Sequence, residues 1–243
     1  MNKLSFYALH LFIGASMLIG TSSCISKSKT VSAQNSIQTV ITPVNLTEND
    51  NPLIALKEGN ERFISGKPLH IHQDLQKVKD LAEGQNPKAV IIGCSDSRVS
   101  PEILFDQGMG DLFIIRTAGN VMGDYELGSI EYATEHLHTK LVVVLGHYGC
   151  GAIHAMLEHK DDEHVPGHIA HIIHSLKEEA EEQEVFKTSE NIPMDAVKAN
   201  VLHGVRQLRE SDPILKEQYK KGEVRIVGAI YHLDNGKVDF LEI

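Results

Sequence analysis

Three short runs of consecutive apolar residues dominate the hydrophobic pattern of this 243-residue chain. They cover residues 89–93, 112–115 and 141–145, and each leads directly into a polar or glycine-containing turn. Runs that are apolar at every position are typical of parallel strands buried on both faces of a sheet. The segments between them can form helices, most clearly residues 126–138. The pattern therefore predicts an α/β fold, with a central, mostly parallel β-sheet flanked by helices.

The C-terminal part of the chain extends this pattern. Residues 224–231 predict a fourth strand. The Asp-Asn-Gly sequence at 234–236, followed by alternating apolar residues, predicts a turn into a short final strand and thus an edge hairpin. Between the third and fourth strands, residues 151–221 should be mainly helical, with three prolines that mark helix starts or breaks.

The first 49 residues have a different composition. Residues 4–20 are mostly apolar and are followed by small residues up to Cys24, which predicts a secretion signal over residues 1–24. The apolar run is too short and too interrupted for a stable spanning helix. Residues 25–49 are polar, without a sustained apolar period, and predict a flexible tether or extended arm. We expect residues 50–243 to form a single folded domain.

The position of Cys24 is similar to that of the cysteine in a bacterial lipoprotein signal, where this residue becomes the lipidated start of the mature protein. Such signals usually carry Leu or another aliphatic residue three positions earlier, whereas this chain has Thr21, so ordinary signal cleavage is the alternative. Both interpretations predict export. Lipidation further predicts a lipid anchor in the periplasm or cell envelope of a Gram-negative bacterium.

Composition and charge narrow the class of partner. The chain is 42% hydrophobic and 23% charged, as in an ordinary globular protein. Its formal net charge is −10 and it has no run of Lys or Arg, which argues against binding to nucleic acid or directly to anionic lipid. We therefore expect a small-molecule partner, and contact with a membrane only through the N-terminal lipid.

Two cysteines and a histidine follow the predicted strands. Cys94 follows the first strand, and His147 and Cys150 follow the third. Because the carboxyl ends of parallel strands meet at one edge of a sheet, these side chains should lie together. Two thiolates, one imidazole and an open fourth position are typical of a catalytic zinc site, so we expect one Zn²⁺ per chain. The competing interpretations are buried small side chains and a redox pair, although no Cys-x-x-Cys motif supports the latter.

Asp96 and Arg98 lie in the loop that follows Cys94. Two residues apart, they can pair as a carboxylate and a guanidinium fork. In that arrangement Arg98 holds Asp96 off the metal, and Asp96 can accept a proton or hydrogen bond from the nucleophile. A simple loop salt bridge is the alternative interpretation.

Four motifs together resemble a β-class carbonic anhydrase: CSDSRVSPE, FIIRTAGN, GSIEYA and LGHYGCGAI, in this order and spacing, in a resemblance that extends from about Pro52 to the C-terminus. The resemblance implies a zinc lyase that reversibly hydrates CO2 to bicarbonate and a proton through zinc-bound hydroxide. It also implies a homodimer or a higher even-numbered oligomer. The family's zinc ligands correspond to Cys94, His147 and Cys150, and its catalytic pair corresponds to Asp96 and Arg98.

The same resemblance implies a substrate pocket. Family members with an always-open site use a glutamine before the first cysteine, a phenylalanine on the second strand and a tyrosine on the next helix. The matching residues are Gln85, Phe113 and Tyr132, together with Gly151 after the second cysteine. Without the resemblance, the two aromatic residues would be interpreted as core and Gln85 as part of a surface turn.

A second branch of the family binds bicarbonate at a regulatory pocket that contains a tryptophan three residues before the first cysteine. Ile91 stands at that position, and the chain has no tryptophan. Gly93, directly before Cys94, matches the residue at that position in the regulated branch. Gln85 and the missing tryptophan nevertheless favour the open, unregulated type.

Two further stretches lie outside these motifs. Six histidines occur between residues 154 and 174, and three of them are spaced three residues apart. A proton relay or a weak second metal site is conceivable, but the spacing favours an exposed, histidine-rich helix. The glutamates of residues 178–184 predict a solvated acidic face.

Two other functions remain open at this level. An enzyme of the same fold and metal could hydrolyse a sulfur analogue of CO2, such as CS2 or COS. Access to the pocket would distinguish such an enzyme from a carbonic anhydrase. A non-catalytic zinc-binding envelope protein is the other alternative, but it would have no need of Asp96, Arg98 and Gln85.

Overall fold

The computed structural model describes residues 51–159 and 165–241. The chain divides into two units, residues 1–45 and 46–243, and all of the described residues belong to the second. The expected signal, the tether and Cys24 therefore lie outside the described residues. No helix in the described part of the chain is both long and apolar enough to cross a lipid bilayer.

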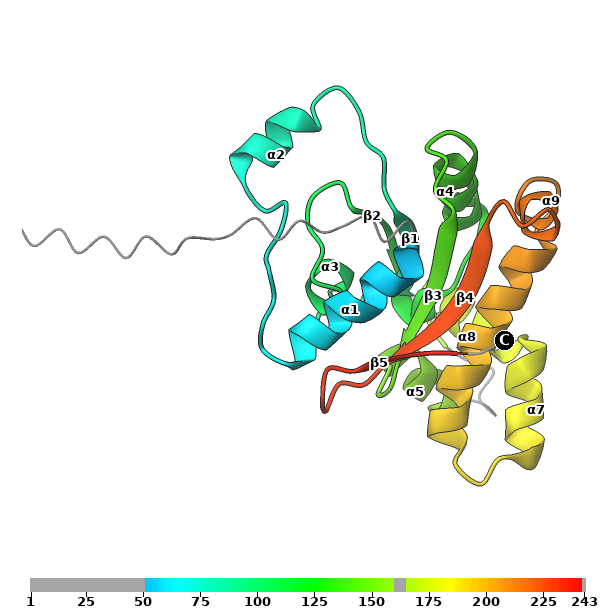
Figure 1. The fold of residues 1–243 in the computed structure, drawn as a ribbon. Helices are drawn as coiled ribbons and strands as arrows, with labels where there is room; N and C mark the ends of the chain where they lie inside the picture. The colour runs from blue at the N-terminus through cyan, green and yellow to red at the C-terminus, as the bar shows by residue number, and fades with distance from the viewer. Residues whose placement is uncertain (1–50, 160–164, 242–243) are drawn as a thin grey trace, which may run out of the picture. The chain divides into compact units, whose positions relative to one another are not determined.

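A five-stranded sheet forms the centre of the described unit (Figure 1). Its strands are β1 (Ala89–Cys94), β2 (Leu112–Thr117), β3 (Leu141–His147), β4 (Arg225–Tyr231) and β5 (Val238–Phe240). In the order β2-β1-β3-β4-β5, the first four strands run parallel and β5 pairs antiparallel with β4. This arrangement confirms the predicted α/β fold and its C-terminal edge hairpin.

Nine α-helices and one 3-10 turn surround the sheet in the described residues. They are α1 (Pro52–Ile64), α2 (Leu75–Asp80), α3 (Pro101–Leu104), the 3-10 turn η1 (Ala118–Asn120), α4 (Asp124–Glu135), α5 (Gly151–Glu158), α6 (Ile169–Lys177), α7 (Ala180–Thr188), α8 (Ile192–Glu210) and α9 (Leu215–Lys220). As expected, the chain between β3 and β4 is mainly helical.

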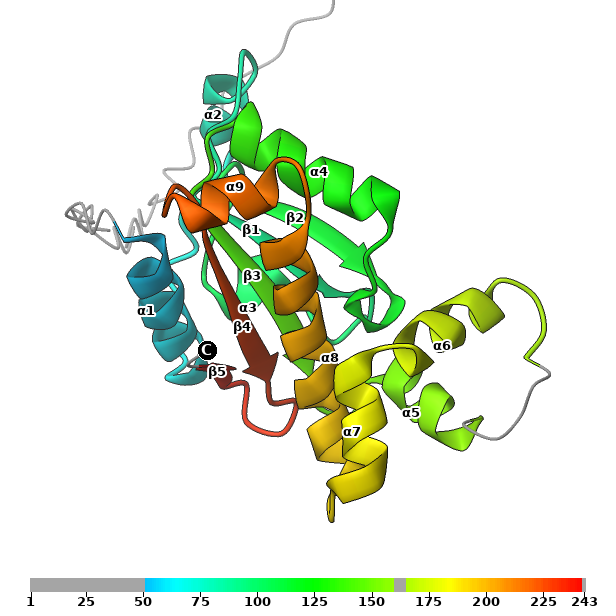
Figure 2. The same ribbon diagram turned by 90° about the vertical axis from the view of Figure 1, so that its right-hand side faces the viewer.

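Each face of the sheet has its own hydrophobic cluster, because successive strand side chains point to opposite faces. Val90 and Ile92 of β1 belong to a cluster that includes residues of α4, α5, α6, α8 and α9. Ala89 and Ile91 belong to a second cluster, with residues of α1 and α3. Figures 1 and 2 show α1 against one face and α8 against the other. Burial on both faces explains why β1 and β3 are apolar along their length.

The expectation of a solvated acidic face over residues 178–184 is wrong for two side chains. Glu179 is 4% exposed and Glu182 is fully buried. These residues are three apart, so they lie on the same side of the chain as α7 begins, and α7 packs against α8. Charge composition alone does not reveal which side of a short helix faces a neighbour.

Candidate metal centre

Cys94, His147 and Cys150 come together at the carboxyl edge of the sheet. Cys94 is the last residue of β1 and His147 the last residue of β3, the neighbouring strand. After His147 the chain turns through Gly149, whose φ of 69° lies in the left-handed region, and Cys150 then caps α5. The three ligand atoms all lie within 4.8 Å of one another. The arrangement predicted from the strand ends is therefore present in the structure.

The imidazole of His147 is oriented by the backbone. Its Nδ1 lies 3.1 Å from the carbonyl oxygen of Tyr148, which can only accept a hydrogen bond, so Nδ1 carries the proton. Nε2 is consequently a lone-pair donor, and it is buried without a hydrogen-bond partner within residues 51–159 and 165–241. A buried imidazole nitrogen without a partner, facing two sulfurs, fits a metal ligand.

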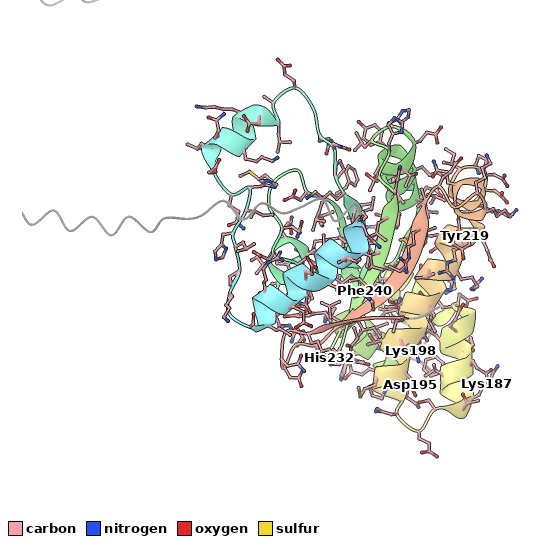
Figure 3. All side chains as sticks on the ribbon, viewed as in Figure 1. Lys187, Asp195, Lys198, Tyr219, His232 and Phe240 are labelled. Atoms are coloured by element: carbon pink, nitrogen blue, oxygen red, sulfur yellow. The ribbon has the colours of Figure 1, made fainter. Side chains whose placement is uncertain are left out.

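The loop that follows β3 is also tied to the end of β4. The backbone N–H of Tyr148 donates to the Tyr231 carbonyl at 3.1 Å. The Tyr148 ring meets His232 edge-on, with ring centroids 4.9 Å apart, and Figure 3 labels His232 at the end of the sheet where β4 finishes. These contacts fix the backbone that carries the Tyr148 carbonyl, and so the tautomer of His147.

The two sulfurs differ in how they hold a proton. They are 3.8 Å apart and form no disulfide. The hydrogen bond from Cys150 lowers the pKa of Cys94 to about 4, against the opposing effect of burial, and the same hydrogen bond raises the pKa of Cys150. The hydrogen bond between the two sulfurs therefore favours one shared proton, because it lowers the pKa of one thiol and raises that of the other. Two sulfurs and one imidazole nitrogen form a donor set that suits Zn²⁺.

Asp96 and Arg98 form a two-pronged ion pair beside these ligands. Oδ1 of Asp96 accepts hydrogen bonds from the backbone N and from Nε of Arg98, both at 2.9 Å, and Oδ2 accepts from Nη2 at 2.6 Å. This guanidinium holds the pKa of the Asp96 carboxyl far below its usual range. Nη2 also donates to the Gly149 carbonyl at 3.1 Å, which links the loops after β1 and β3. Oδ2 lies 3.9 Å from Nε2 of His147, so the carboxylate borders the cluster.

Two residues that the sequence analysis did not single out support Cys94. Arg116 of β2 donates from Nε to the Cys94 carbonyl at 3.0 Å and from Nη2 to the Asp96 carbonyl at 2.6 Å. The backbone N–H of Gly119 donates to the Cys94 sulfur at 3.4 Å. An arginine inside an otherwise apolar strand was a signal in the sequence, whereas nothing local marked the Gly119 contact.

The two aromatic residues expected to line the pocket lie away from the metal ligands of this chain. Phe113 pairs with Val90, four positions before the pair of Cys94 and Thr117, which corresponds to about 13 Å along the strand. Tyr132 of α4 is 47% exposed, and its ring lies 6.4 Å from that of Phe113.

The other two expected pocket residues differ in position. Gln85 is exposed and precedes the amino end of β1, whereas Cys94 ends that strand. Gly151 begins α5, directly after Cys150. The structure thus brings Phe113 and Tyr132 together but does not bring them to the metal ligands of the same chain.

The histidines of α6 do not add a second preorganised site. His168, His171 and His174 are exposed, and the rings of the first two are 6.2 Å apart. Within residues 51–159 and 165–241, Cys94, His147 and Cys150 are the only group of three or more His, Cys, Asp or Glu side chains with ligand atoms close enough for one ion.

Comparisons with known proteins agree with this geometry. The family model described as "Carbonic anhydrase" matches residues 89–238. The chain is 41% identical over 195 residues to a carbonic anhydrase of Mycolicibacterium smegmatis, covering 79% of this chain and 94% of that protein. It also resembles the structure of the β-carbonic anhydrase CcaA, with a TM-score of 0.61 and 26% identity over 79% of this chain and all of the other. Tetrameric β-carbonic anhydrases of Sordaria macrospora share the fold, with a TM-score of 0.61 and 24% identity over 76% of this chain and 94% of theirs.

Proposed function

This chain belongs to the β-class carbonic anhydrase family and is a carbonic anhydrase, and from this premise we propose that Cys94, His147 and Cys150 hold one Zn²⁺ for the reversible hydration of CO2. The main support is the buried Nε2 of His147, which faces two sulfurs and has no hydrogen-bond partner among the residues that the structure describes. The shared proton of the two cysteines would leave when a dication binds, because the ligating form of cysteine is the thiolate.

When bound, Zn²⁺ supplies the Lewis acidity that lowers the pKa of water from 15.7 to about 7 in favourable sites. The residues of the chain then orient the reactants. Both oxygens of Asp96 accept hydrogen bonds from Arg98, so Asp96 stays ionised and can accept a further hydrogen bond from the attacking water. The water oxygen forms the new bond to the carbon of CO2, and the proton leaves to buffer, which yields bicarbonate.

Arg98 also keeps Asp96 from acting as a ligand. A carboxylate 3.9 Å from the His147 nitrogen could move onto the metal and block the position that water needs. The guanidinium fork engages both carboxylate oxygens and is itself anchored by the Gly149 carbonyl. We assign Arg98 the role of holding this fourth position open, which supports the unregulated type of site.

Gln85, Phe113 and Tyr132 complete the pocket only if a second copy of the chain supplies them. Within one chain, Phe113 and Tyr132 lie about four strand positions from Cys94, at the β2 edge of the described sheet. A homodimer that pairs this edge with the metal centre of its partner would put two aromatic rings around a small uncharged substrate. Gly151, next to Cys150, would border the same pocket from the first copy.

The experiment that tests the catalytic proposal is stopped-flow CO2 hydration by the purified full chain. We expect hydration that depends on added Zn²⁺ and is lost on chelation, and a fall of at least tenfold in kcat for Asp96→Asn, because the amide nitrogen cannot accept the hydrogen bond from water. Asp80→Asn on the exposed α2 is the control and should match the wild type. Hydration that is unaffected by removing the metal would rule out the proposal.

We further propose that Cys24 is lipidated and anchors the protein in the periplasm or envelope of a Gram-negative bacterium. The support is in the sequence: an apolar stretch that ends in small residues directly before a cysteine, followed by a polar segment. Mass spectrometry of the mature N-terminus is the test. A diacylated or triacylated Cys24 is the expected result, and an unmodified cleavage product would overturn it.

A further inference from the structure

The turn η1 brings a backbone donor to the metal centre. Its Gly119 and Asn120 have φ values of 67° and 48°, both in the left-handed region. The Gly119 N–H donates to the Cys94 sulfur at 3.4 Å. A Cβ at Gly119 would lie 3.0 Å from the Cβ of Ala152, which is two residues beyond Cys150. This turn therefore contacts both segments that carry a cysteine ligand. Glycine and asparagine adopt left-handed backbone readily, so the turn is not strained, but its position relative to Cys94 depends on support for Asn120.

A buried chain of side-chain hydrogen bonds provides that support from α7 and α8, which lie side by side in Figure 2. Nδ2 of Asn120 donates to Oδ1 of Asn200 at 2.6 Å. Nδ2 of Asn200 in turn lies 3.3 and 3.5 Å from the two carboxyl oxygens of Glu179. The two asparagines are 4% and 3% exposed and Glu179 is 4% exposed. In each of these hydrogen bonds the donor lies nearer the turn and the acceptor lies nearer α7.

The protonated carboxyl group of Glu179 fixes the orientation of the Asn200 side chain. Asn200 borders a cavity of about 170 Å³ that Asn120, Glu179, His203 and Gln207 also line. Burial, and then the neighbouring Glu182, raise the pKa of Glu179 to about 9, so its carboxyl group is protonated near neutral pH. A neutral carboxyl group beside the amide of Asn200 is a stable hydrogen-bond partner at this depth, where a lone charge would be costly. Glu179 thus holds the Asn200 side chain in the orientation that accepts the hydrogen bond from Asn120.

We propose that Asn200 is a positioning residue for the metal centre, because it fixes Asn120 and thereby aims the Gly119 N–H at the Cys94 sulfur. This inference rests on the proposed metal centre. The N–H to sulfur bond withdraws electron density from the Cys94 sulfur and also restrains its position. Losing this bond leaves the sulfur richer in electrons, which lowers the energy of a charge-transfer band, and less firmly held, which speeds metal release. The hydrogen bonds of the Asn200 side chain go to Asn120 and Glu179, so its route to the Cys94 sulfur runs through the turn.

A matched control residue exists on the other face of the sheet. Asn60 of α1 is also a buried asparagine, 3% exposed. Its side chain donates to the Leu104 and Gly236 carbonyls at 3.1 and 3.0 Å and accepts from the Val238 backbone N at 2.8 Å. Asn60→Ala therefore removes a comparable set of hydrogen bonds from the fold without touching η1.

The test compares Asn200→Ala with Asn60→Ala in the full chain, loaded with Co²⁺ or Zn²⁺. We expect a lower melting temperature for both variants. Only Asn200→Ala should shift the thiolate-to-cobalt charge-transfer band to lower energy and speed Zn²⁺ release to a chelator by about tenfold, equivalent to roughly 1.4 kcal/mol. A band and a release rate that match those of Asn60→Ala would overturn the inference. If the wild type binds neither ion, the proposed metal centre itself is wrong.

A second variant covers the case in which Asn200→Ala does not fold. Asn120→Gly removes the same hydrogen bond, and glycine tolerates the φ of 48° at this position. By itself it should shift the cobalt charge-transfer band to lower energy relative to the wild type, and an unchanged band would overturn the inference. Where Asn200→Ala folds, the double variant should add nothing to this shift, because both substitutions break one link. Additive shifts would mean that Asn200 does not act through Asn120. Glu179→Gln keeps an acceptor for Asn200 and should leave the band in place.

Discussion

Cys94 depends on backbone and side-chain groups from segments far away in sequence. Its sulfur accepts the Gly119 N–H, and its carbonyl accepts from Arg116. Cys150 lies 3.8 Å away and is the main cause of the low pKa of Cys94. The fold thus holds the Cys94 sulfur in place, because the neighbours that favour negative charge on it also fix its direction.

Gly119→Ala tests this dependence at one residue. The added methyl group would lie 3.0 Å from the Cβ of Ala152, and the φ of 67° is unfavourable for alanine, so we expect a loss of about 1–2 kcal/mol in the free energy of unfolding. Zn²⁺ release should also be faster, since the N–H that contacts the Cys94 sulfur moves. Chemical denaturation and chelator kinetics measure the two effects.

The control for that substitution is Gly128→Ala in α4, where, apart from the helix's own backbone and the two neighbouring residues, no atom of the described residues lies within 4 Å of the added Cβ. Alanine is about 1 kcal/mol better than glycine in a helix interior, so this variant should be neutral or more stable. Equal stability of the two variants would show that the turn tolerates a side chain.

At the scale of elements, the pair α7 and α8 combines buried glutamates with an exposed ion pair. Burial raises the pKa of Glu182 to about 8. The neighbouring Glu181 instead has its pKa lowered to about 2, mainly by the hydrogen bonds from Arg206. Glu182 is therefore neutral at pH 7 because it is buried against α8, whereas the adjacent Glu181 is ionised because it pairs with Arg206.

Glu182→Gln should make stability less dependent on pH. Between pH 4.5 and about 8 the unfolded chain loses a proton that folded Glu182 keeps, so wild-type stability falls across this range and levels off above it. The loss is on the order of a few kcal/mol, and glutamine removes it. Urea unfolding at pH 5 and pH 8 measures the slope. Glu184→Gln on the same helix, at an exposed site, is the control. An unchanged slope in Glu182→Gln would contradict the expectation.

At the scale of the whole molecule, the expected pocket is divided between two places. The metal ligands and Asp96 lie at the carboxyl ends of β1 and β3, whereas Phe113 and Tyr132 lie towards the amino end of the β2 edge. A single chain cannot place these aromatic rings over its own metal centre without unpairing β2 from β1. Two copies can, if each supplies its β2 edge to the other.

Co-expression of Asp96→Asn with Tyr132→Ala tests this arrangement. If the pocket is shared, a mixed dimer has one intact site, because one chain supplies a normal metal centre and the other a normal Tyr132. About a quarter of the wild-type rate should return, since half of the dimers are mixed and each has one working site of two. If each chain builds its own pocket, every site carries a defect and the mixture stays as inactive as the separate variants.

Much of this protein could be predicted from its sequence. Continuous apolar runs favour parallel strands, so the four parallel strands, the final hairpin and the ends that carry Cys94, His147 and Cys150 follow from local pattern. The expectation of burial on both faces holds for β1 and β3 but is wrong for β2, which is only half-buried at the edge of the sheet. The pairing of Asp96 with Arg98 is also local, because two residues in one loop can reach each other without help from the rest of the fold.

Tertiary structure alone decided the contacts between distant segments. The carbonyl that sets the tautomer of His147, the N–H that meets the Cys94 sulfur, the burial of Glu179 and the separation of Phe113 from the ligands all depend on strand register and helix packing. Register and packing arise from many weak long-range contacts, none of which leaves a periodic signal in the chain. The sequence by itself therefore determined which groups do the chemistry, and the fold determined how each of them is held.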